Sequence, residues 1–376
     1  MTHHRIHRFL TEHAPPTPCL VVDPAVVTAR VREFAAELPH HGLYYAVKAN
    51  PQPAVLRAVL AAGGLFDVAS PAEITACLEA GAAPESLSYG NPIKKPADIA
   101  FAFERGVRIF TTDSEADLEH LARCAPGSSV SVRLRVDGPA SATPFGAKFG
   151  CSPGEAVDLL RRAAGQGLDP AGLAFHVGSQ QTEPAAWDTA IAASAKVFTE
   201  LAGHGIRLRR LNVGGGFGIG YRAPAPPLSA YAATIRAGLQ AHFPGGAPEI
   251  VLEPGRAVVA EAGLIRTEVV LVAQRGEHRW VYLDIGRYNG LAETENEAIP
   301  YRFEPVGGPG GPVGPVILAG PTCDGDDVLY QRTPYELPLA LRPGDQLDIL
   351  DTGAYTTSYS SVSFNGIEPL RTYCLD

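Results

Sequence analysis

The sequence has no long hydrophobic run. No stretch of about 18 uncharged apolar residues occurs, which is the length that a membrane-spanning helix requires. The first residues are rich in histidine and arginine, and they lack the apolar core of a secretory signal peptide. We therefore expect a protein that is neither exported by that route nor inserted in a membrane.

Paired cysteines and an excess of positive charge are missing as well. The six cysteines are widely scattered, with no CxxC pair and no cysteine and histidine spacing typical of a metal site. This pattern is typical of reduced thiols and predicts a cytoplasmic protein without a bound metal. The formal net charge of −9 argues against nucleic acid as a partner and favours a small-molecule substrate.

The chain of 376 residues is long enough for one large domain or two ordinary ones. Short runs of strand-forming residues alternate with helical stretches at residues 43–47, 65–69, 86–89, 107–111, 130–136, 172–177, 208–213 and 249–253. Because crossover helices join parallel strands, this alternation predicts an α/β fold, a (β/α)8 TIM-like barrel. A doubly wound open sheet is the alternative.

After residue 255 the pattern changes to strands separated by turns rich in glycine and proline. The predicted strands are residues 269–273, 280–284, 315–319, 346–350 and 361–364. We therefore expect a barrel over residues 26–255 and a C-terminal β domain over 256–376. Residues 1–25 are expected to contribute one strand to the β domain, followed by a helix from 24 to about 38 with Asp23 as its N-cap.

Polar side chains and glycines follow the predicted barrel strands. In a parallel barrel the chemistry collects at the carboxyl ends of the strands, so these residues are the candidates for a site. They are Lys48, Asp67, Arg135, His176, Ser179, Gly214, Gly215, Gly216, Glu253, Gly255 and Arg256.

Each of these residues also has a purely structural interpretation. A strand-end lysine can be solvated or ion-paired, and a strand-end histidine more often supports structure than catalysis. The glycine run over residues 213–220 is either a tight turn or a set of backbone amides for a phosphate, and the prolines after it argue against a dinucleotide fingerprint. Taken together, an amine, a ring, an acid and a phosphate cup meet the needs of pyridoxal phosphate.

Short motifs along the chain closely resemble those of the alanine-racemase-fold decarboxylases, the pyridoxal-phosphate-dependent group of ornithine, lysine and diaminopimelate decarboxylases. The resemblance runs in order from about residue 17 to residue 370. The motifs are YAVKAN (45–50), FDVAS (66–70), FHVGSQ (175–180), VGGGF (213–217), EPGR (253–256), GPTCD (320–324) and GAYT (353–356).

The resemblance implies pyridoxal 5′-phosphate as the cofactor. Lys48 is then the lysine that forms the internal aldimine, Glu253 pairs with the ring nitrogen, and His176 stacks on the ring face. Asp67 and Arg135 are expected near the aldimine side. The phosphate is expected to be held by Ser179, Gly215, Gly216, Gly255, Arg256 and Tyr355.

The resemblance also implies a homodimer with active sites at the subunit interface, in which Cys323 and Asp324 come from the second subunit. A racemase would be expected to present a tyrosine there, whereas Cys323 within GPTCD resembles the decarboxylases, whose thiol returns a proton to Cα. We therefore expect decarboxylation rather than racemisation. A non-catalytic regulatory relative, like the antizyme inhibitors, is a poorer fit because Lys48, Glu253, Cys323 and Tyr355 are retained.

The expected substrate is an L-amino acid of the ornithine or lysine type, which links the enzyme to polyamine biosynthesis. One segment differs from the ornithine enzymes, because Arg302, after Tyr301, falls where an aspartate would bind the distal ammonium. A guanidinium suits a carboxylate, so a carboxylate-bearing conjugate of siderophore or antibiotic assembly is the alternative. Asp324, or an acid within residues 293–297, could still bind a distal amine.

Overall fold

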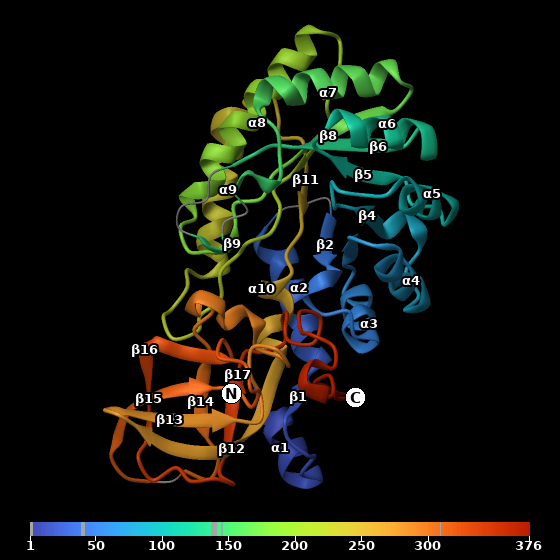
Figure 1. The fold of residues 1–376 in the computed structure, drawn as a ribbon. Helices are drawn as coiled ribbons and strands as arrows, with labels where there is room; N and C mark the ends of the chain where they lie inside the picture. The colour runs from blue at the N-terminus through green and yellow to red at the C-terminus, as the bar shows by residue number, and fades with distance from the viewer. Residues whose placement is uncertain (1–2, 39–41, 137–140, 144–145, 309) are drawn as a thin grey trace. The chain divides into compact units, whose positions relative to one another are not determined.

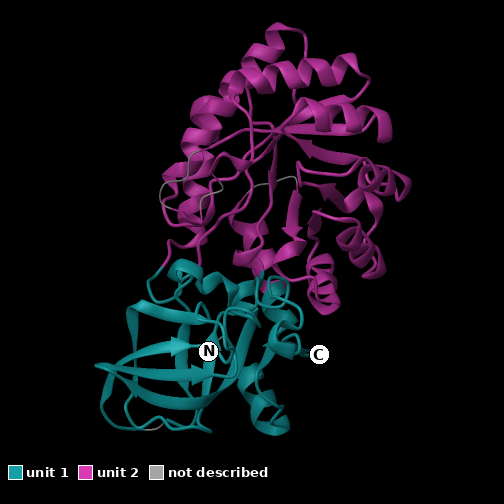
Figure 2. Cartoon of the chain, in the orientation of Figure 1, with its two compact units in different colours: residues 1–27, 220–224, 259–376 teal, residues 28–219, 225–258 magenta. Residues whose placement is uncertain are grey.

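The computed structural model describes residues 3–38, 42–136, 141–143, 146–308 and 310–376. The chain divides into two compact units (Figure 2). The barrel unit consists of Thr28–Ile219 and Ala225–Val258, and the β unit of Met1–Val27, Gly220–Pro224 and Val259–Asp376. The domain boundaries expected from the sequence were contiguous, whereas the structure groups the short segment Gly220–Pro224 with the β unit.

Eight parallel strands close the barrel in the order β10-β11-β2-β3-β4-β5-β6-β8 (Figure 1). Pairing of β11 with β2 closes the cylinder, so the predicted (β/α)8 barrel is confirmed and the open sheet is excluded. The strands are β2 (Gly42–Ala46), β3 (Leu65–Val68), β4 (Leu87–Tyr89), β5 (Ile109–Thr112), β6 (Ser129–Arg133), β8 (Asp169–Ala174), β10 (Arg210–Asn212) and β11 (Glu249–Leu252).

Helices connect successive barrel strands and lie around the outside of the strands (Figure 1). Many begin with proline in the first turn, where a missing backbone N–H costs nothing. Ser152 and Glu155 add a capping box at the start of α7. Helix α2 (Pro24–Glu37) precedes the first barrel strand, and the connecting helices are α3 (Pro53–Ala61), α4 (Pro71–Glu79), α5 (Pro96–Glu104), α6 (Glu115–Cys124), α7 (Pro153–Gly165), α8 (Ala185–Gly203) and α9 (Leu228–His242).

The β unit contains a sheet with the strand order β14-β17-β12-β13-β15-β16, and β1 pairs with both β12 and β18. The strands are β1 (Cys19–Val22), β12 (Gly263–Arg275), β13 (His278–Leu283), β14 (Arg302–Pro305), β15 (Val313–Ala319), β16 (Val328–Pro338), β17 (Gln346–Leu350) and β18 (Arg371–Cys374). The predicted strand at residues 361–364 is wrong. Ser363 and Asn365 there have φ of 59° and 54°, which an extended strand excludes.

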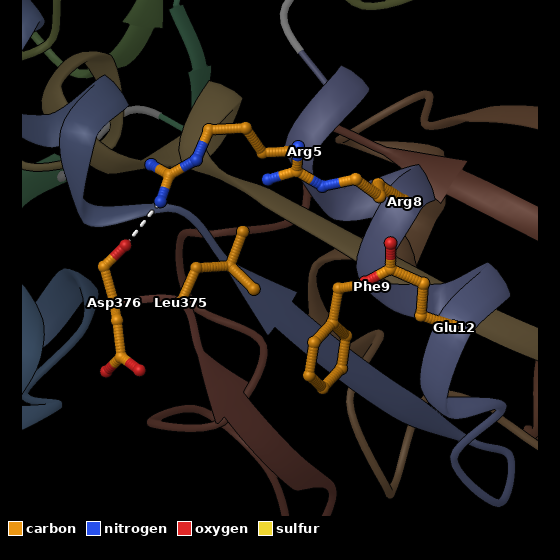
Figure 3. A pocket seen from close by; sticks show the side chains of 6 residues that line it. All are labelled: Arg5, Arg8, Phe9, Glu12, Leu375 and Asp376. Carbon is orange, nitrogen blue, oxygen red and sulfur yellow. Dashed lines mark hydrogen bonds between the residues drawn. The ribbon is translucent and has the colours of Figure 1, made fainter.

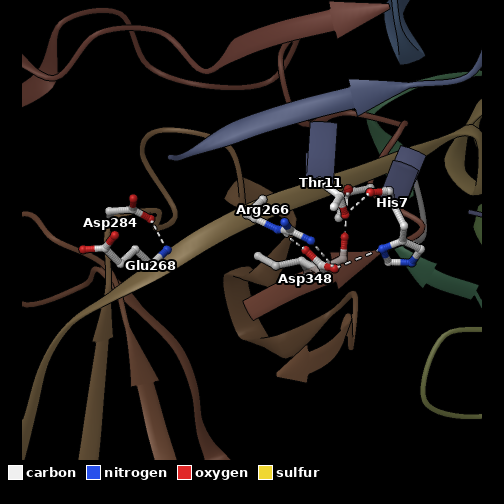
Figure 4. Close-up of polar contacts among 8 residues, drawn as sticks. His7, Thr11, Arg266, Glu268, Asp284 and Asp348 are labelled. Carbon is white, nitrogen blue, oxygen red and sulfur yellow. Dashed lines mark hydrogen bonds and ion pairs between the residues drawn. The ribbon is translucent and has the colours of Figure 1, made fainter. Parts of the chain in front are cut away.

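Helix α1 (His4–His13), which the sequence analysis did not predict, is held in the β unit by polar contacts at two points. Arg5 donates to Asp23 at 2.6 Å and also to the backbone oxygen of Asp376 (Figure 3). His7 lies 3.3 Å from the Asp348 carboxylate, which accepts from Arg266 at 2.7 Å (Figure 4). Apolar side chains of α1 complete the contact by packing against β1, β12 and β17.

Two general features of the described chain bear on its environment. No helix in the described ranges is both long and apolar enough to cross a membrane. All six cysteines are free thiols, and three of them, Cys19, Cys77 and Cys151, are buried.

Candidate active site

Lys48 lies in a short 3-10 turn (η1, Val47–Ala49) directly after β2, at the carboxyl end of the barrel. All residues of β2 are buried, whereas the side chain of Lys48 is exposed. The turn is fixed by the backbone of Asn50, whose N–H donates to Val47 and whose carbonyl accepts from the Tyr45 hydroxyl at 3.1 Å. The sequence thus ends a buried strand with one accessible amine.

Asp67 and Glu73 form an acidic pair on neighbouring elements. Burial raises the pKa of Asp67 well above its usual range, the charge of Glu253 raises it further, and Lys48 opposes the rise. The Asp67 carboxylate packs against Gly90, where an added Cβ would lie 2.1 Å from Oδ1. Within the described residues Oδ1 of Asp67 is buried without a hydrogen-bond partner. A buried acceptor of this kind is suited to a ligand that donates to it.

Glu73, which the sequence analysis missed, accepts from the backbone N–H of Ala69 at 2.6 Å. Its backbone N–H donates to Ser70, the N-cap of α4, at 3.2 Å. Burial raises the pKa of Glu73, while the Ala69 N–H and Lys48 lower it. The Ser-x-x-Glu spacing before α4 was the sequence signal that could have identified this side chain.

Glu253 follows β11 and is held by Asn212 at the end of β10. The Asn212 amide donates to Oε1 of Glu253 at 2.5 Å, and its own oxygen accepts from the N–H of Gly214 at 2.9 Å. Burial raises the pKa of Glu253, whereas the bond from Asn212 and the charges of Arg133 and Lys48 lower it. Asn212 was not predicted, and it links the acid to the glycine run.

His176 follows β8 and joins the ionisable cluster of Lys48, Asp67, Glu73 and Glu253. The backbone N–H of Gly178 donates to Nδ1 of His176 at 3.0 Å. Nδ1 therefore carries no proton, which leaves Nε2 as the N–H of a neutral ring. Burial lowers the pKa of His176 well below its usual range, and the charges of Arg133 and Lys48 lower it further. The ring is thus uncharged at neutral pH.

The arginine in this cluster is Arg133, and the structure does not bring Arg135 to it. Burial lowers the pKa of Arg133, while the charges of Glu253, Asp113 and Asp67 favour its charged form. Arg135 lies two residues further, is exposed, and its backbone donates to Cys151 at 2.9 Å.

The glycine run forms a loop whose backbone lies very close to the backbone of neighbouring segments. An added Cβ would lie 2.3 Å from the Phe175 oxygen at Gly214, and 2.2 Å from the Gly178 oxygen at Gly216. Gly214 and Gly216 also have φ of 70° and 95°, which favours glycine. In the described chain the N–H groups of Gly215 and Gly216 have no hydrogen-bond partner. This geometry fits a phosphate.

Other predicted phosphate-binding residues lie on neighbouring segments of the barrel unit. Ser179 begins β9 (Ser179–Gln181), which pairs with the short strand β7 (Ser141–Thr143). Gly255 precedes Arg256, which begins α10 (Arg256–Val259) and is only 5% exposed. A guanidinium with so little exposure is suited to a charge-assisted hydrogen bond with a phosphate group.

Cys323 and Asp324 lie in the β unit, in the loop between β15 and β16. Buried Asp327 fixes this loop by accepting from the Thr322 N–H at 3.1 Å and the Thr322 hydroxyl at 2.7 Å. The Cys323 side chain is exposed, and its sulfur accepts from the Asn365 amide at 3.2 Å. The fold therefore presents the thiol at the surface of its own unit.

The other predicted residues of the β unit have different environments. Arg302 on β14 donates to Asp351 at 2.5 Å, which compensates the charge of its guanidinium. Tyr301 is fully buried, and its ring lies 5.4 Å from that of Tyr221. Tyr355 has φ of 59° in a turn after β17.

Comparison with known proteins matches the family model described as "Pyridoxal-dependent decarboxylase, pyridoxal binding domain" over residues 25–260. The lysine/ornithine decarboxylase of Selenomonas ruminantium is 34% identical over 358 residues, covering 93% of this chain and 88% of the relative.

Two solved structures extend the likeness to the fold. The lysine/ornithine decarboxylase of Vibrio vulnificus, complexed with cadaverine, has a TM-score of 0.88 at 30% identity and covers 99% of this chain and 98% of its own. The arginine decarboxylase of Paramecium bursaria Chlorella virus has a TM-score of 0.90 at 27% identity, with 100% of both chains covered. The chain therefore belongs to the pyridoxal-phosphate-dependent, alanine-racemase-fold decarboxylases and is an amino-acid decarboxylase.

Proposed function

We propose that the protein removes the α-carboxylate of ornithine or lysine, giving CO2 and a diamine of the kind used in polyamine biosynthesis. The acidic surroundings of Cys323 carry this choice. Asp324 follows the thiol directly, with Asp326 and Asp327 close behind. Negative charge beside the thiol favours a substrate with a distal ammonium over one with a distal carboxylate. The lysine/ornithine decarboxylases named above support the same substrate class.

The alternative substrate, a carboxylate-bearing conjugate, would depend on Arg302. The structure favours this alternative less, because the guanidinium of Arg302 is already paired with Asp351, which is 3% exposed. A conjugate would have to compete with that carboxylate for the same donors.

Bound pyridoxal phosphate supplies an electron sink for the pair left on Cα as CO2 departs. In our proposal Lys48 attaches the cofactor through its amine, and Glu253 holds a proton at the ring nitrogen. Neutral His176 would lie against the ring, while Asp67 and Arg133 would lie beside its reacting end. These roles are supported by the position of the side chains in one cluster at the carboxyl end of the barrel, where each side chain shifts the pKa of another.

The phosphate would be held by backbone N–H groups, hydroxyls and one guanidinium. The N–H groups of Gly215 and Gly216, which have no hydrogen-bond partner among the described residues, and the near-complete burial of Arg256 support this placement. The proposed set is Ser179, Gly215, Gly216, Gly255, Arg256 and Tyr355.

We infer further that the enzyme is a cytoplasmic homodimer in which Cys323 and Asp324 serve the active site of the second copy. Cys323 would return a proton to Cα after CO2 has left. The exposed thiol supports this role. Asn365, which contacts the sulfur, follows a segment with exposed apolar side chains that suit a subunit interface: Tyr359 at 55%, Val362 at 79% and Phe364 at 37% exposure. The free thiols of the cysteines support the proposed cytoplasmic location.

The test is CO2 release from a panel of ornithine, lysine, arginine, diaminopimelate and acidic conjugates, using wild type and Arg302→Ala. We expect turnover of ornithine or lysine that the substitution leaves nearly unchanged. Activity confined to acidic conjugates and lost in Arg302→Ala would instead establish the alternative substrate.

A further inference from the structure

We propose that Gln180 is a positioning residue that fixes the glycine loop, residues 214–219, for the cofactor phosphate. Its side chain makes two hydrogen bonds to one residue at the end of that loop. Nε2 donates to the backbone oxygen of Ile219 at 2.5 Å, and Oε1 accepts from the backbone N–H of Ile219 at 3.0 Å. These two hydrogen bonds hold the end of the loop in the way that a pair of backbone hydrogen bonds holds two adjacent strands together.

The backbone of Gln180 indicates that its side chain is needed at this position. Gln180 has φ of 55°, in the left-handed region that glycine adopts freely and that costs a residue with a Cβ free energy. Glycine already occupies such a conformation two residues earlier, at Gly178, with φ of 96°. Glutamine occupies this position although glycine would adopt the same φ without the cost, and the two hydrogen bonds to Ile219 are the benefit that the structure offers.

The other contacts of the loop leave its middle open to a ligand. Gly214 donates its N–H to Asn212 at 2.9 Å, and Gly218 donates to the Tyr231 hydroxyl at 3.3 Å. With Ile219 held by Gln180, the loop is fixed at both ends. The N–H groups of Gly215 and Gly216, between those ends, remain without a partner in the described chain. Fixed ends and free central donors form a preorganised anion site.

The chain after Ile219 explains why the barrel unit needs its own clamp. The next segment, Gly220–Pro224, belongs to the β unit. There the Tyr221 ring packs 5.4 Å from Tyr301, and the Arg222 guanidinium lies 4.7 Å from the Tyr335 ring centre. Gln180 therefore fixes the end of the phosphate loop to the barrel unit at the point where the chain passes into the β unit.

The test compares pyridoxal phosphate with pyridoxal, which lacks the phosphate, as ligands of the cofactor-free protein. Absorbance and fluorescence titrations give the Kd of each. We expect Gln180→Ala to raise the Kd for pyridoxal phosphate about 10- to 100-fold, the effect of losing two ordinary hydrogen bonds. The Kd for pyridoxal should stay within about twofold, because the ring-binding groups are untouched. Gln240→Ala, on the exposed face of α9, is the matched control and should alter neither value.

Two further variants separate the clamp from backbone strain. Gln180→Gly removes both, so it should still bind pyridoxal phosphate weakly, whereas recovery to wild-type affinity would overturn the proposal. Gln180→Glu keeps the acceptor for the Ile219 N–H but loses the donor, and should also weaken binding. These variants keep the proposal testable should Gln180→Ala fail to fold, as monitored by circular dichroism.

The inference rests on the proposed phosphate position, and Arg256→Met separates the two. Selective loss of pyridoxal phosphate affinity in Arg256→Met but not in the Gln180 variants would leave the phosphate site intact and overturn the role of Gln180. No selective loss in either would overturn the phosphate position itself. An equal loss of both ligands in Gln180→Ala would mean general damage to the barrel and would also overturn the proposal.

Discussion

The two units present their reactive groups in opposite ways. In the barrel unit Asp67, Glu253 and His176 are desolvated strongly enough to shift their pKa values, and backbone or amide donors fix Glu253 and His176. In the β unit Cys323 is exposed, and one amide, that of Asn365, contacts its sulfur. The barrel unit is thus built to hold a charged cofactor rigidly, whereas the β unit presents a thiol outward.

This difference matches two chemical tasks. Stabilising the charge of a cofactor requires fixed dipoles and ions in a dry site, because water would screen them. Delivering a proton requires a group that can reach the substrate only when the site is assembled. Changes in the barrel unit should therefore affect cofactor binding and activity together, and changes at Cys323 should affect activity alone.

The largest effect is expected for Lys48→Ala. The cofactor loses its covalent attachment, because the other side chains of the described cluster, Asp67, Arg133, His176 and Glu253, carry no primary amine, so activity should fall to background. Loss of the absorbance band of the enzyme-bound cofactor and loss of CO2 release measure the two effects. Lys196→Ala, on the exposed face of α8, is the control and should keep both. Turnover near the wild-type rate in Lys48→Ala would show that the strand-one assignment is wrong.

The next effect is expected for Cys323→Ala. Cofactor absorbance should be unchanged, while diamine formation should slow by roughly 10²- to 10⁴-fold, the usual contribution of a positioned acid. Some turnover should end as aldehyde, with the cofactor converted to its amine form, because the proton then arrives at the cofactor carbon instead of Cα. Chromatography of the products measures the partition.

Cys124→Ala, another incompletely buried thiol, serves as the control for Cys323. A Cys323→Ala enzyme with the wild-type rate and product ratio would remove the thiol from the mechanism. A loss of cofactor absorbance in this variant would contradict the division of tasks between the two units.

Strand periodicity and strand-end chemistry were enough to predict the barrel and most of its cluster from the sequence. The sequence analysis selected Arg135 rather than Arg133 because the strand was expected to run to residue 136, whereas β6 ends at Arg133. Both arginines fall on the same face of an ideal strand, since side chains alternate with a period of two. The bridge of Leu134 to Cys151 redirects the chain, and a contact so distant in sequence leaves no local signal.

The same limit explains the other differences between sequence and structure. Asn212 reaches Glu253 because β10 and β11 are neighbours in the closed barrel, which local pattern does not reveal. The alternating polar and apolar residues at 361–364 imitate a strand, but Ser363 and Asn365 adopt left-handed conformations that asparagine tolerates well. The conformations of these residues therefore depend on contacts between segments that are distant in sequence.

Arg133→Met and Arg135→Met form a matched pair that tests the structural assignment. Removing Arg133 takes a positive charge away from Glu253 and Asp67, so activity should fall about 10- to 100-fold, the loss for a charged hydrogen-bonding group. Arg135→Met removes an exposed charge and should change activity less than about twofold. Steady-state CO2 release at saturating cofactor measures both. The reverse order of effects would restore the assignment made from the sequence.

The smallest effect is expected for Asn212→Asp and appears as a shift in pH dependence. Burial already raises the pKa of Glu253, and the Asn212 N–H opposes that rise by stabilising the carboxylate. Aspartate keeps an acceptor for Gly214 but replaces the donor with a like charge, so the pKa of Glu253 must rise. Glu253 then becomes protonated at a higher pH as the solution is acidified. The acid limb of the activity profile should move upward by about one pH unit.

Asp158→Asn, which removes an exposed carboxylate on α7, is the control and should leave the acid limb in place. Cofactor affinity measured at a pH well above the acid limb separates a change in the position of Glu253 from a change in its charge. If only the charge of Glu253 has changed, this affinity should be nearly that of wild type. An acid limb that stays in place or moves to lower pH in Asn212→Asp would show that Glu253 does not set it. Glu253 would then be a structural partner of Asn212. The difference in burial between the barrel cluster and the exposed thiol would then not reflect two chemical tasks.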